Sequence, residues 1–222
     1  MKTKILVSLV LVLVFLASAL AGCAPSVNGD MPKYAVGDTW VSRWITEGST
    51  YTVTTIVTGE QVVNGKNCWI FTTTFDPAYQ NVVSVTNQYD KSNMDIVRSD
   101  YKTDKPDGSF TSIGYEVVGK PFYPLKVGKV VTETDYMETV YGNKSLATSE
   151  NTTQITATLV EKTETVTVAA GTFHCFKVIK YDDSGNVTGT TWRSDKTKLF
   201  QVKATDASSP NDTYELVSYS LK

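Results

Sequence analysis

The 222-residue sequence is poor in the residues that enzymes use most often for catalysis and metal binding. It contains one histidine, His174, and three cysteines. A catalytic triad would have to use this one imidazole, and a zinc site would lack its usual ligands. The G-x-S-x-G elbow and the glycine-rich phosphate-binding motifs are missing. We therefore predict that the protein is not an enzyme and needs no metal or cofactor.

The chain also lacks an excess of charge of either sign. It has 21 Lys and Arg against 23 Asp and Glu, which gives a formal net charge of −2. Basic and acidic residues are interspersed, so no cluster of positive charge is present to attract a polyanion. The sequence therefore argues against a nucleic-acid partner.

Long apolar runs are missing except at the amino terminus. Lys2 and Lys4 precede an aliphatic run from Ile5 to Leu16, and small residues follow it. This layout is typical of an export signal, whereas a membrane-spanning helix needs about 20 apolar residues. We predict that residues 1–22 are a signal peptide, and spanning is the weaker alternative.

The residues that end this segment, Leu20-Ala21-Gly22-Cys23, resemble the lipobox of bacterial lipoproteins. The resemblance implies that Cys23 becomes the first residue of the mature protein and carries diacylglycerol and a further acyl group such as palmitate. Two or more acyl chains give a lasting anchor, whereas one binds reversibly. The implied location is the extracytoplasmic side of the cell membrane or outer membrane. An ordinary signal peptide with a chance cysteine is the alternative.

The rest of the chain divides into a short polar segment and one domain. Residues 23–33 are rich in turn formers and predict a flexible tether, and residues 34–222 are long enough for a single core. Within the domain, runs such as Thr50–Val57 alternate polar and apolar residues, and Gly, Asn, Asp and Pro clusters separate the runs. We predict an all-β fold of about a dozen antiparallel strands in a curved sheet, a half-barrel or a two-layer sandwich.

Similar segments recur in the two halves of this domain. Val36-Gly37-Asp38 matches Val127-Gly128-Lys129, and the segment from Val63 to Phe71 matches that from Ala170 to Val178. The offsets vary, so diverged repeats over 34–119 and 125–222 and two merely similar meanders both stay open. Two independent domains that meet near residues 119–124 are a further alternative.

The segment from Thr165 to Val178, followed by Thr191-Trp192-Arg193-Ser194-Asp195, resembles a pattern of exported β-proteins. Those proteins are similar in outline to the LolA/LolB-like periplasmic carriers. The resemblance implies an antiparallel sheet curved into a half-barrel that holds acyl chains.

Few residues stand out as candidate sites. Cys68 and Cys175 could form a disulfide in an oxidising compartment, or could be two small buried residues. Trp40 and Trp44 share one strand face, which is either core or the wall of a cleft. The candidate ligand-lining residues are Trp40, Trp44, Trp69 and Trp192.

Three functions follow from these features. The first is a membrane-anchored surface lipoprotein whose β domain binds a hydrophobic small molecule, a sugar or an envelope protein. The second is a carrier of lipid or other hydrophobic molecules. The third, which is disfavoured, is an envelope hydrolase that uses His174.

Overall fold

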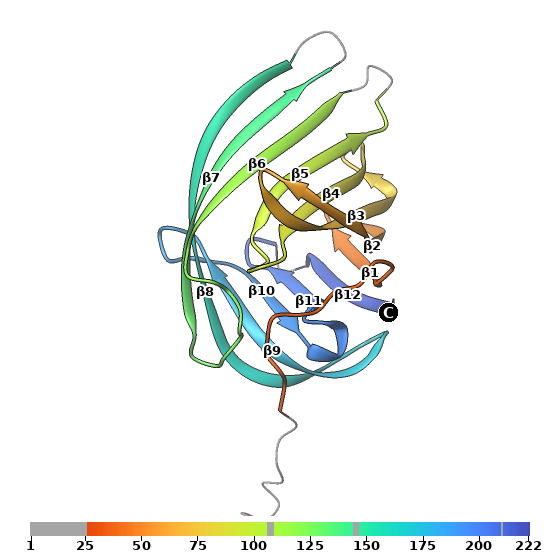
Figure 1. Ribbon diagram of the computed structural model, residues 1–222. Helices are drawn as coiled ribbons and strands as arrows, with labels where there is room; N and C mark the ends of the chain where they lie inside the picture. Colours follow the sequence, from red (N-terminus) through yellow and green to blue (C-terminus); the bar gives the residue numbers. More distant parts are fainter. Residues whose placement is uncertain (1–25, 106–108, 144–146, 210) are drawn as a thin grey trace, which may run out of the picture.

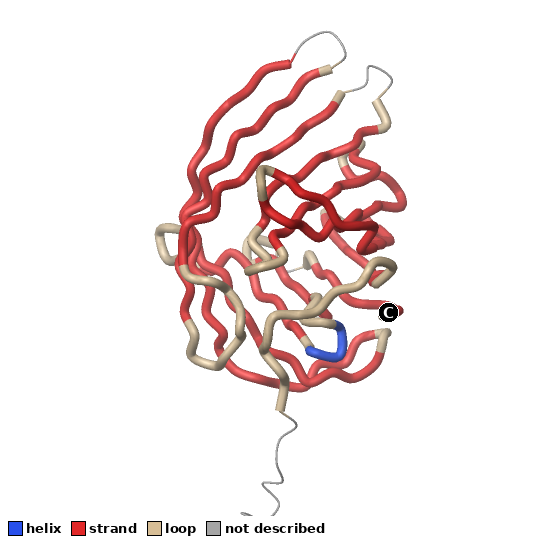
Figure 2. Tube along the Cα trace, viewed as in Figure 1, coloured by secondary structure: helices blue, strands red, loops and turns tan. Residues whose placement is uncertain are grey.

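The computed structural model describes residues 26–105, 109–143, 147–209 and 211–222. Strands make up nearly all of the described structure, with one short 3-10 helix between them (Figure 2). The elements are β1 (Thr39–Thr46), β2 (Ser49–Val63), β3 (Lys66–Tyr79), β4 (Val82–Asp90), β5 (Ile96–Thr103), β6 (Phe110–Gly119), β7 (Val130–Gly142), β8 (Ala147–Val168), β9 (Gly171–Tyr181), β10 (Val187–Arg193), η1 (Asp195–Thr197), β11 (Gln201–Asp206) and β12 (Thr213–Ser220).

The strands form one antiparallel sheet that closes on itself (Figure 1). Each strand pairs with its neighbours in sequence, and β1 pairs with both β2 and β12. The predicted all-β fold of about a dozen antiparallel strands is confirmed. Closure goes further than the predicted curved sheet, because a closed barrel leaves no unpaired edge strand. Among the described residues, no helix has the length and hydropathy needed to cross a membrane.

Local sequence explains the first hairpins of this barrel. In β2, Val53, Thr55 and Val57 are buried, whereas the residues between them are partly exposed, as expected for alternating strand faces. The turn from β2 to β3 consists of Asn64 and Gly65, whose φ angles are 49° and 76°. Asn and Gly tolerate positive φ, so they suit a two-residue hairpin turn.

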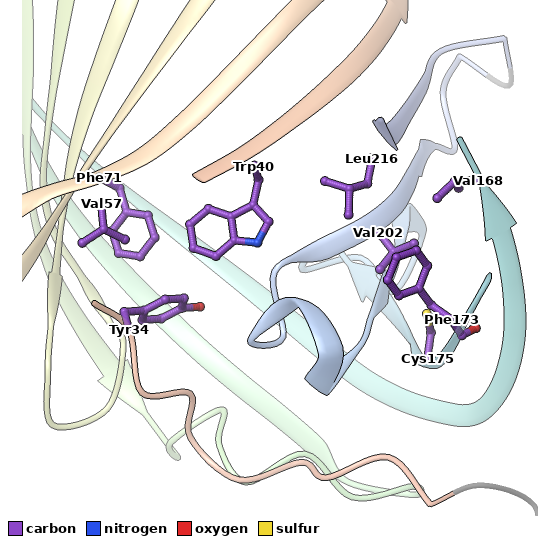
Figure 3. Packing of buried hydrophobic residues seen from close by; sticks show 9 residues of the cluster. All are labelled: Tyr34, Trp40, Val57, Phe71, Val168, Phe173, Cys175, Val202 and Leu216. Atoms are coloured by element: carbon purple, nitrogen blue, oxygen red, sulfur yellow. Dashed lines mark hydrogen bonds between the residues drawn. The ribbon is translucent and has the colours of Figure 1, made fainter. Parts of the chain in front are cut away.

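The long hairpin of β8 and β9 curves beneath the barrel (Figure 1). The pairing of these strands shifts register between Val160 and Lys162, and such a bulge bends a strand. Beyond the bend, the backbone N–H of Ala170 donates to the Leu216 carbonyl at 3.2 Å. This hairpin helps to bury the main core, which Figure 3 shows as Tyr34, Trp40, Val57, Phe71, Val168, Phe173, Cys175, Val202 and Leu216.

The segment before β1 lies against the same end of the barrel. The Gly29 carbonyl accepts a hydrogen bond from the Leu125 backbone N–H at 2.6 Å, and the Asn28 N–H donates to Asp195 at 3.1 Å. A β-carbon on Gly29 would lie 2.0 Å from the Leu125 carbonyl oxygen, so this approach requires glycine. Residues 26–33, the described part of the predicted tether, therefore make contacts that a free tether would not make.

The two predicted repeats, 34–119 and 125–222, each contain six strands. In each half, a loop before the first strand is joined to the second strand by the same pair of backbone hydrogen bonds. In the first half, the Gly37 N–H donates to the Val57 carbonyl (2.8 Å) and the Val57 N–H donates to the Asp38 carbonyl (2.9 Å). In the second half, the Gly128 N–H donates to the Val160 carbonyl (2.8 Å) and the Val160 N–H donates to the Lys129 carbonyl (2.9 Å). The sequence matches thus fall at structurally equivalent places.

Candidate functional site

A cavity of about 390 Å³ lies inside the barrel. Its wall is formed mainly by the inward faces of β2, β3, β4 and β11 and by segments that cover one end. Aromatic rings dominate this wall, and hydroxyl and amide groups accompany them. The lining residues are Tyr34, Val53, Thr55, Phe71, Thr73, Phe75, Asn87, Tyr89, Met94, Phe122, Tyr123, Arg193, Phe200, Gln201 and Tyr214.

This central cavity adjoins three further spaces in the barrel. One of about 400 Å³ shares Thr73, Phe75 and Asn87 with it, and one of about 380 Å³ shares Gln201 and Tyr214. A third, of about 360 Å³, shares residues that include Tyr89 and Arg193 and is called the acidic cavity below. Because the cavities have lining residues in common, they lie next to one another, and their linings differ in polarity. Volumes of this size are in the range of about 300–1,000 Å³ that is usual for small-molecule sites.

Of the predicted ligand-lining tryptophans on β1, one lines the interior space and one is core. Trp44 lines two of the adjoining cavities, where its ring lies 4.5 Å from that of Tyr79. Trp40 is fully buried and stacks on Phe200 at 4.5 Å between ring centroids. Its indole N–H donates to the Thr197 carbonyl at 3.1 Å, which ties β1 to η1.

The other two tryptophans lie outside the wall of the central cavity. Trp69 packs against the main core, and the Lys91 ammonium lies 3.9 Å from its ring centroid. The Trp192 indole N–H donates to the Glu164 carboxylate at 2.6 Å. Both side chains are thus used in contacts with other parts of the barrel, and neither lines the central cavity.

Arg193 is the only charged residue among the described residues that line the central cavity. It ends β10, where its Nη1 donates to the Leu199 carbonyl at 3.0 Å. Its guanidinium carbon lies 5.7 Å from the centroid of the Phe122 ring. Its buried Nε has no hydrogen-bond partner within the described part of the chain.

Three tyrosines surround this guanidinium. Burial raises the pKa of Tyr89 to about 12, and burial also raises the pKa values of Tyr34 and Tyr123. The charge of Arg193 opposes each rise, and a side-chain hydrogen bond joins it to Tyr123. These phenols therefore stay neutral at physiological pH and keep their O–H donors. The Tyr34 hydroxyl donates to the Lys198 carbonyl at 3.1 Å.

The acidic cavity, which shares Tyr89 and Arg193 with the central cavity, is lined in part by carboxyl groups. Its lining includes Asp95, Glu133 and Asp135 together with Lys180. Burial raises the pKa of all three acids, and repulsion between the carboxylates adds to the rise for Glu133. Within the described residues, no group of three or more His, Cys, Asp and Glu side chains is arranged to hold a metal ion.

The two cysteines of the domain are free and buried. Cys68 lies on β3 and Cys175 on β9, which are six strands apart in the barrel. Each thiol donates to a carbonyl of its own strand, that of Lys66 or Phe173. The disulfide alternative is therefore wrong, and the alternative of two small buried residues holds. Burial raises the pKa of Cys175 to about 12, which suppresses its reactive thiolate form.

His174 lies on β9, next to Cys175, and does not line the central cavity. Its buried Nδ1 has no hydrogen-bond partner among the described residues. A hydrolase would need a nucleophile held against this imidazole. Cys23, the predicted lipidation site, falls outside the described residues.

Sequence reasoning missed most of the cavity wall. Phe71, Thr73 and Phe75 alternate along β3 and share one face, which is a detectable signal. Whether that face points to a packed core or to a cavity depends on how the sheet closes. The sequence signal for Arg193 was weaker, because a single arginine next to Trp192 does not show whether its side chain points outward or into the barrel.

No family model matches the sequence, and no curated protein matches it. Two solved structures are similar to the chain at low levels. One is a candidate lipoprotein from Parabacteroides distasonis ATCC 8503, with a TM-score of 0.39 and 12% identity, covering 88% of this chain and 100% of that one. The other is a candidate exported protein with a YmcC-like fold from Bacteroides fragilis NCTC 9343, with a TM-score of 0.36, 13% identity and the same coverage. Neither match is close enough to assign a function.

Proposed function

We propose that this protein is a lipid-anchored extracytoplasmic protein whose barrel encloses a small hydrophobic or amphipathic ligand. The observation that carries the proposal is the cavity of about 390 Å³ lined by aromatic side chains inside a closed sheet. Concave, largely apolar sites with a few placed polar groups are the usual setting for small-molecule binding. Of the functions that the sequence left open, this cavity favours a carrier of hydrophobic molecules over surface presentation to a protein partner.

The chemistry of the wall supports binding rather than catalysis. Tyr89 and Tyr123 supply neutral hydroxyls, and Asn87 and Gln201 supply amides. The buried thiol of Cys175 has a pKa of about 12 and lies outside this wall. Such groups orient a ligand by hydrogen bonds and contact, and a non-enzymatic role is therefore part of the proposal.

The anchor is the second part of the proposal and depends on Cys23 in the sequence. Replacement Cys23→Ser removes the thiol that would receive the lipid. We expect the variant to be released from membranes or to stay unprocessed, and we expect labelled palmitate to enter the wild-type protein alone. Wild-type protein without label would contradict the anchor and would leave the cavity proposal untouched.

Filling the cavity tests the binding role. Thr73 lines the central cavity from β3, and Thr73→Phe would place a ring inside it. Thr72 points to the other face, where its hydroxyl lies 3.0 Å from that of Thr58, so Thr72→Phe is a matched control. We expect the neutral fluorescent probe N-phenyl-1-naphthylamine to bind the wild type and the Thr72 variant, and to bind the Thr73 variant at least about tenfold more weakly, because its space is lost. Equal binding by all three proteins would contradict an internal site.

A further inference from the structure

The three arginines of the chain differ in their partners. Arg43 pairs with Glu215 at 3.1 Å and Arg98 pairs with Asp100 at 2.9 Å, both on exposed parts of the sheet. Arg193, the arginine that lines the interior, has no carboxylate within 4.0 Å in the described part of the chain. The arginine that solvent screens least is therefore the one without a counter-charge.

The Arg193 side chain is partly buried, and a partly buried guanidinium without a nearby counter-charge is unfavourable. Arginine keeps its proton at all physiological pH values, so it cannot escape the cost by becoming neutral. The Leu199 carbonyl, the Tyr123 hydroxyl and the Phe122 ring compensate part of this charge, and Nε has no partner among the described residues. Charges that are removed from water are normally balanced by an opposite charge and by hydrogen bonds. An anionic group in the central cavity would supply that opposite charge.

We propose that the central cavity binds an amphipathic acid, whose anionic head pairs with Arg193 and whose apolar part packs among the aromatic rings. This inference rests on the proposed function and specifies its ligand class. The planar guanidinium fork suits a carboxylate or a phosphate group, which share the required chemistry. Phe71, Phe75 and Tyr214 supply apolar surface farther along the same wall.

The neighbouring charges favour one position for the head group. Arg193 also borders the acidic cavity, where Glu133 and Asp135 would repel an anion. The central cavity has no acidic residue among its described lining residues. The head therefore stays on the central side of Arg193, where neutral hydroxyls of Tyr89 and Tyr123 lie in the same wall.

The test compares a carboxylic acid with its methyl ester, which has one more methyl group and no charge. The full mature chain is titrated with 11-(dansylamino)undecanoic acid and with its methyl ester, and fluorescence gives both affinities. Hydrogen bonds to charged groups are stronger than neutral ones, so we expect the wild type to bind the acid about tenfold more tightly than the ester. Equal affinities for acid and ester would overturn the inference while leaving the binding role intact. Binding of neither probe would overturn both proposals.

Variants then assign the preference to one side chain. Arg193→Gln removes the charge and keeps an amide that can donate to the Leu199 carbonyl. We expect this variant to bind acid and ester equally, whereas the control Arg98→Gln keeps the wild-type preference. A preference that survives in a folded Arg193→Gln protein would overturn the role of Arg193. If Arg193→Gln fails to fold, Arg193→Lys is titrated in its place. Lysine keeps the charge and lacks the planar fork, so we expect a weaker preference for the acid. Equal binding of acid and ester by a folded Arg193→Lys protein would overturn the inference.

Competition identifies the head group. Palmitate carries a carboxylate, and lysophosphatidic acid carries a phosphate on a comparable chain. Displacement of the dansyl acid by either supports the inference and names the head. If neither displaces it while hexadecanol does, the inference is overturned.

Discussion

The two halves of the barrel share a backbone pattern and differ in what they place inside it. Each half contains six strands, and each begins with a glycine loop that bonds to a buried valine, Val57 or Val160, on its second strand. In the first half, the inward positions that follow this loop are Trp40, Ser42 and Trp44. In the second half, the same positions, counted from Gly128, hold Val131, Glu133 and Asp135.

This difference divides the interior into two environments. The first half contributes four of the aromatic rings around the central cavity, including Tyr34 and Phe71, whereas residues 125–222 contribute two. The second half contributes Arg193 and two of the three carboxyl groups of the acidic cavity, Glu133 and Asp135. The same backbone arrangement can therefore place mainly apolar side chains inside one half of the barrel and charged side chains inside the other. Whether the halves arose by duplication stays a prediction.

Separation of the halves should have the largest effect. A fragment of residues 34–119 would lose the pairing of β1 with β12 and of β6 with β7, so two strand edges would be exposed. We expect the fragment to be unfolded or aggregated, with no cooperative thermal melt by circular dichroism. A cooperative melt for the fragment would show that the first half is an independent domain.

Equivalent buried positions should differ in their contribution to stability. Trp40→Ala removes a fully buried ring, and such changes cost about 3–5 kcal/mol of unfolding free energy. Val131→Ala removes a smaller side chain, which is 2% exposed, and the cost should be about 1.5–3 kcal/mol at most. Urea unfolding of the full domain measures both. Equal losses would contradict a core that depends on the aromatic residues of the first half.

The acidic wall should make stability depend on pH. Burial raises the pKa of Glu133 and Asp135 in the folded state, so the folded protein favours their protonated forms. The penalty is absent below the unfolded pKa values, near 4, and grows as pH rises through the raised folded values. We expect Glu133→Gln with Asp135→Asn to stabilise the protein at pH 7, by less than Trp40→Ala destabilises it, and to have no such effect at pH 3. Thermal melts at both pH values measure this, and equal effects would contradict the assignment.

We expect the smallest change in unfolding free energy from a surface contact of the first half. The Lys91 ammonium lies over the Trp69 ring at 3.9 Å and pairs with Glu60. Exposed contacts of these kinds contribute about 0.5–1 kcal/mol. Lys91→Met should therefore lower the unfolding free energy by about this amount and should leave probe binding unchanged. A loss comparable to that of Trp40→Ala would show that this contact belongs to the core.

The sequence predicts the fold class better than the site. Period-two runs such as Thr50–Val57 and the Asn64-Gly65 turn are local signals, so the strands and hairpins could be found without a structure. The pairing of β1 with β12 joins the two ends of the domain, and no local pattern specifies it. The closure of the barrel, and the interior space that results from it, therefore could not be predicted from the sequence.

The candidate residues show the same limit. Trp40 and Trp44 share a face as predicted, yet one is core and the other lines the interior space. Cys68 and Cys175 have matching sequence contexts because they occupy matching strands, and the strand order keeps them apart. Arg193 stands out because no carboxylate of the described residues pairs with it, and this depends on how the whole barrel is folded.

A crystal structure with a bromine-labelled fatty acid tests the central claim most directly. The mature protein is crystallised with hexadecanoic acid that carries bromine on its chain, and anomalous scattering locates the bromine. We predict the bromine inside the barrel among Phe71, Phe75 and Tyr214, with the carboxylate at hydrogen-bond distance from Arg193. Bromine found only on the outer surface of the barrel, with the central cavity empty, would contradict the account.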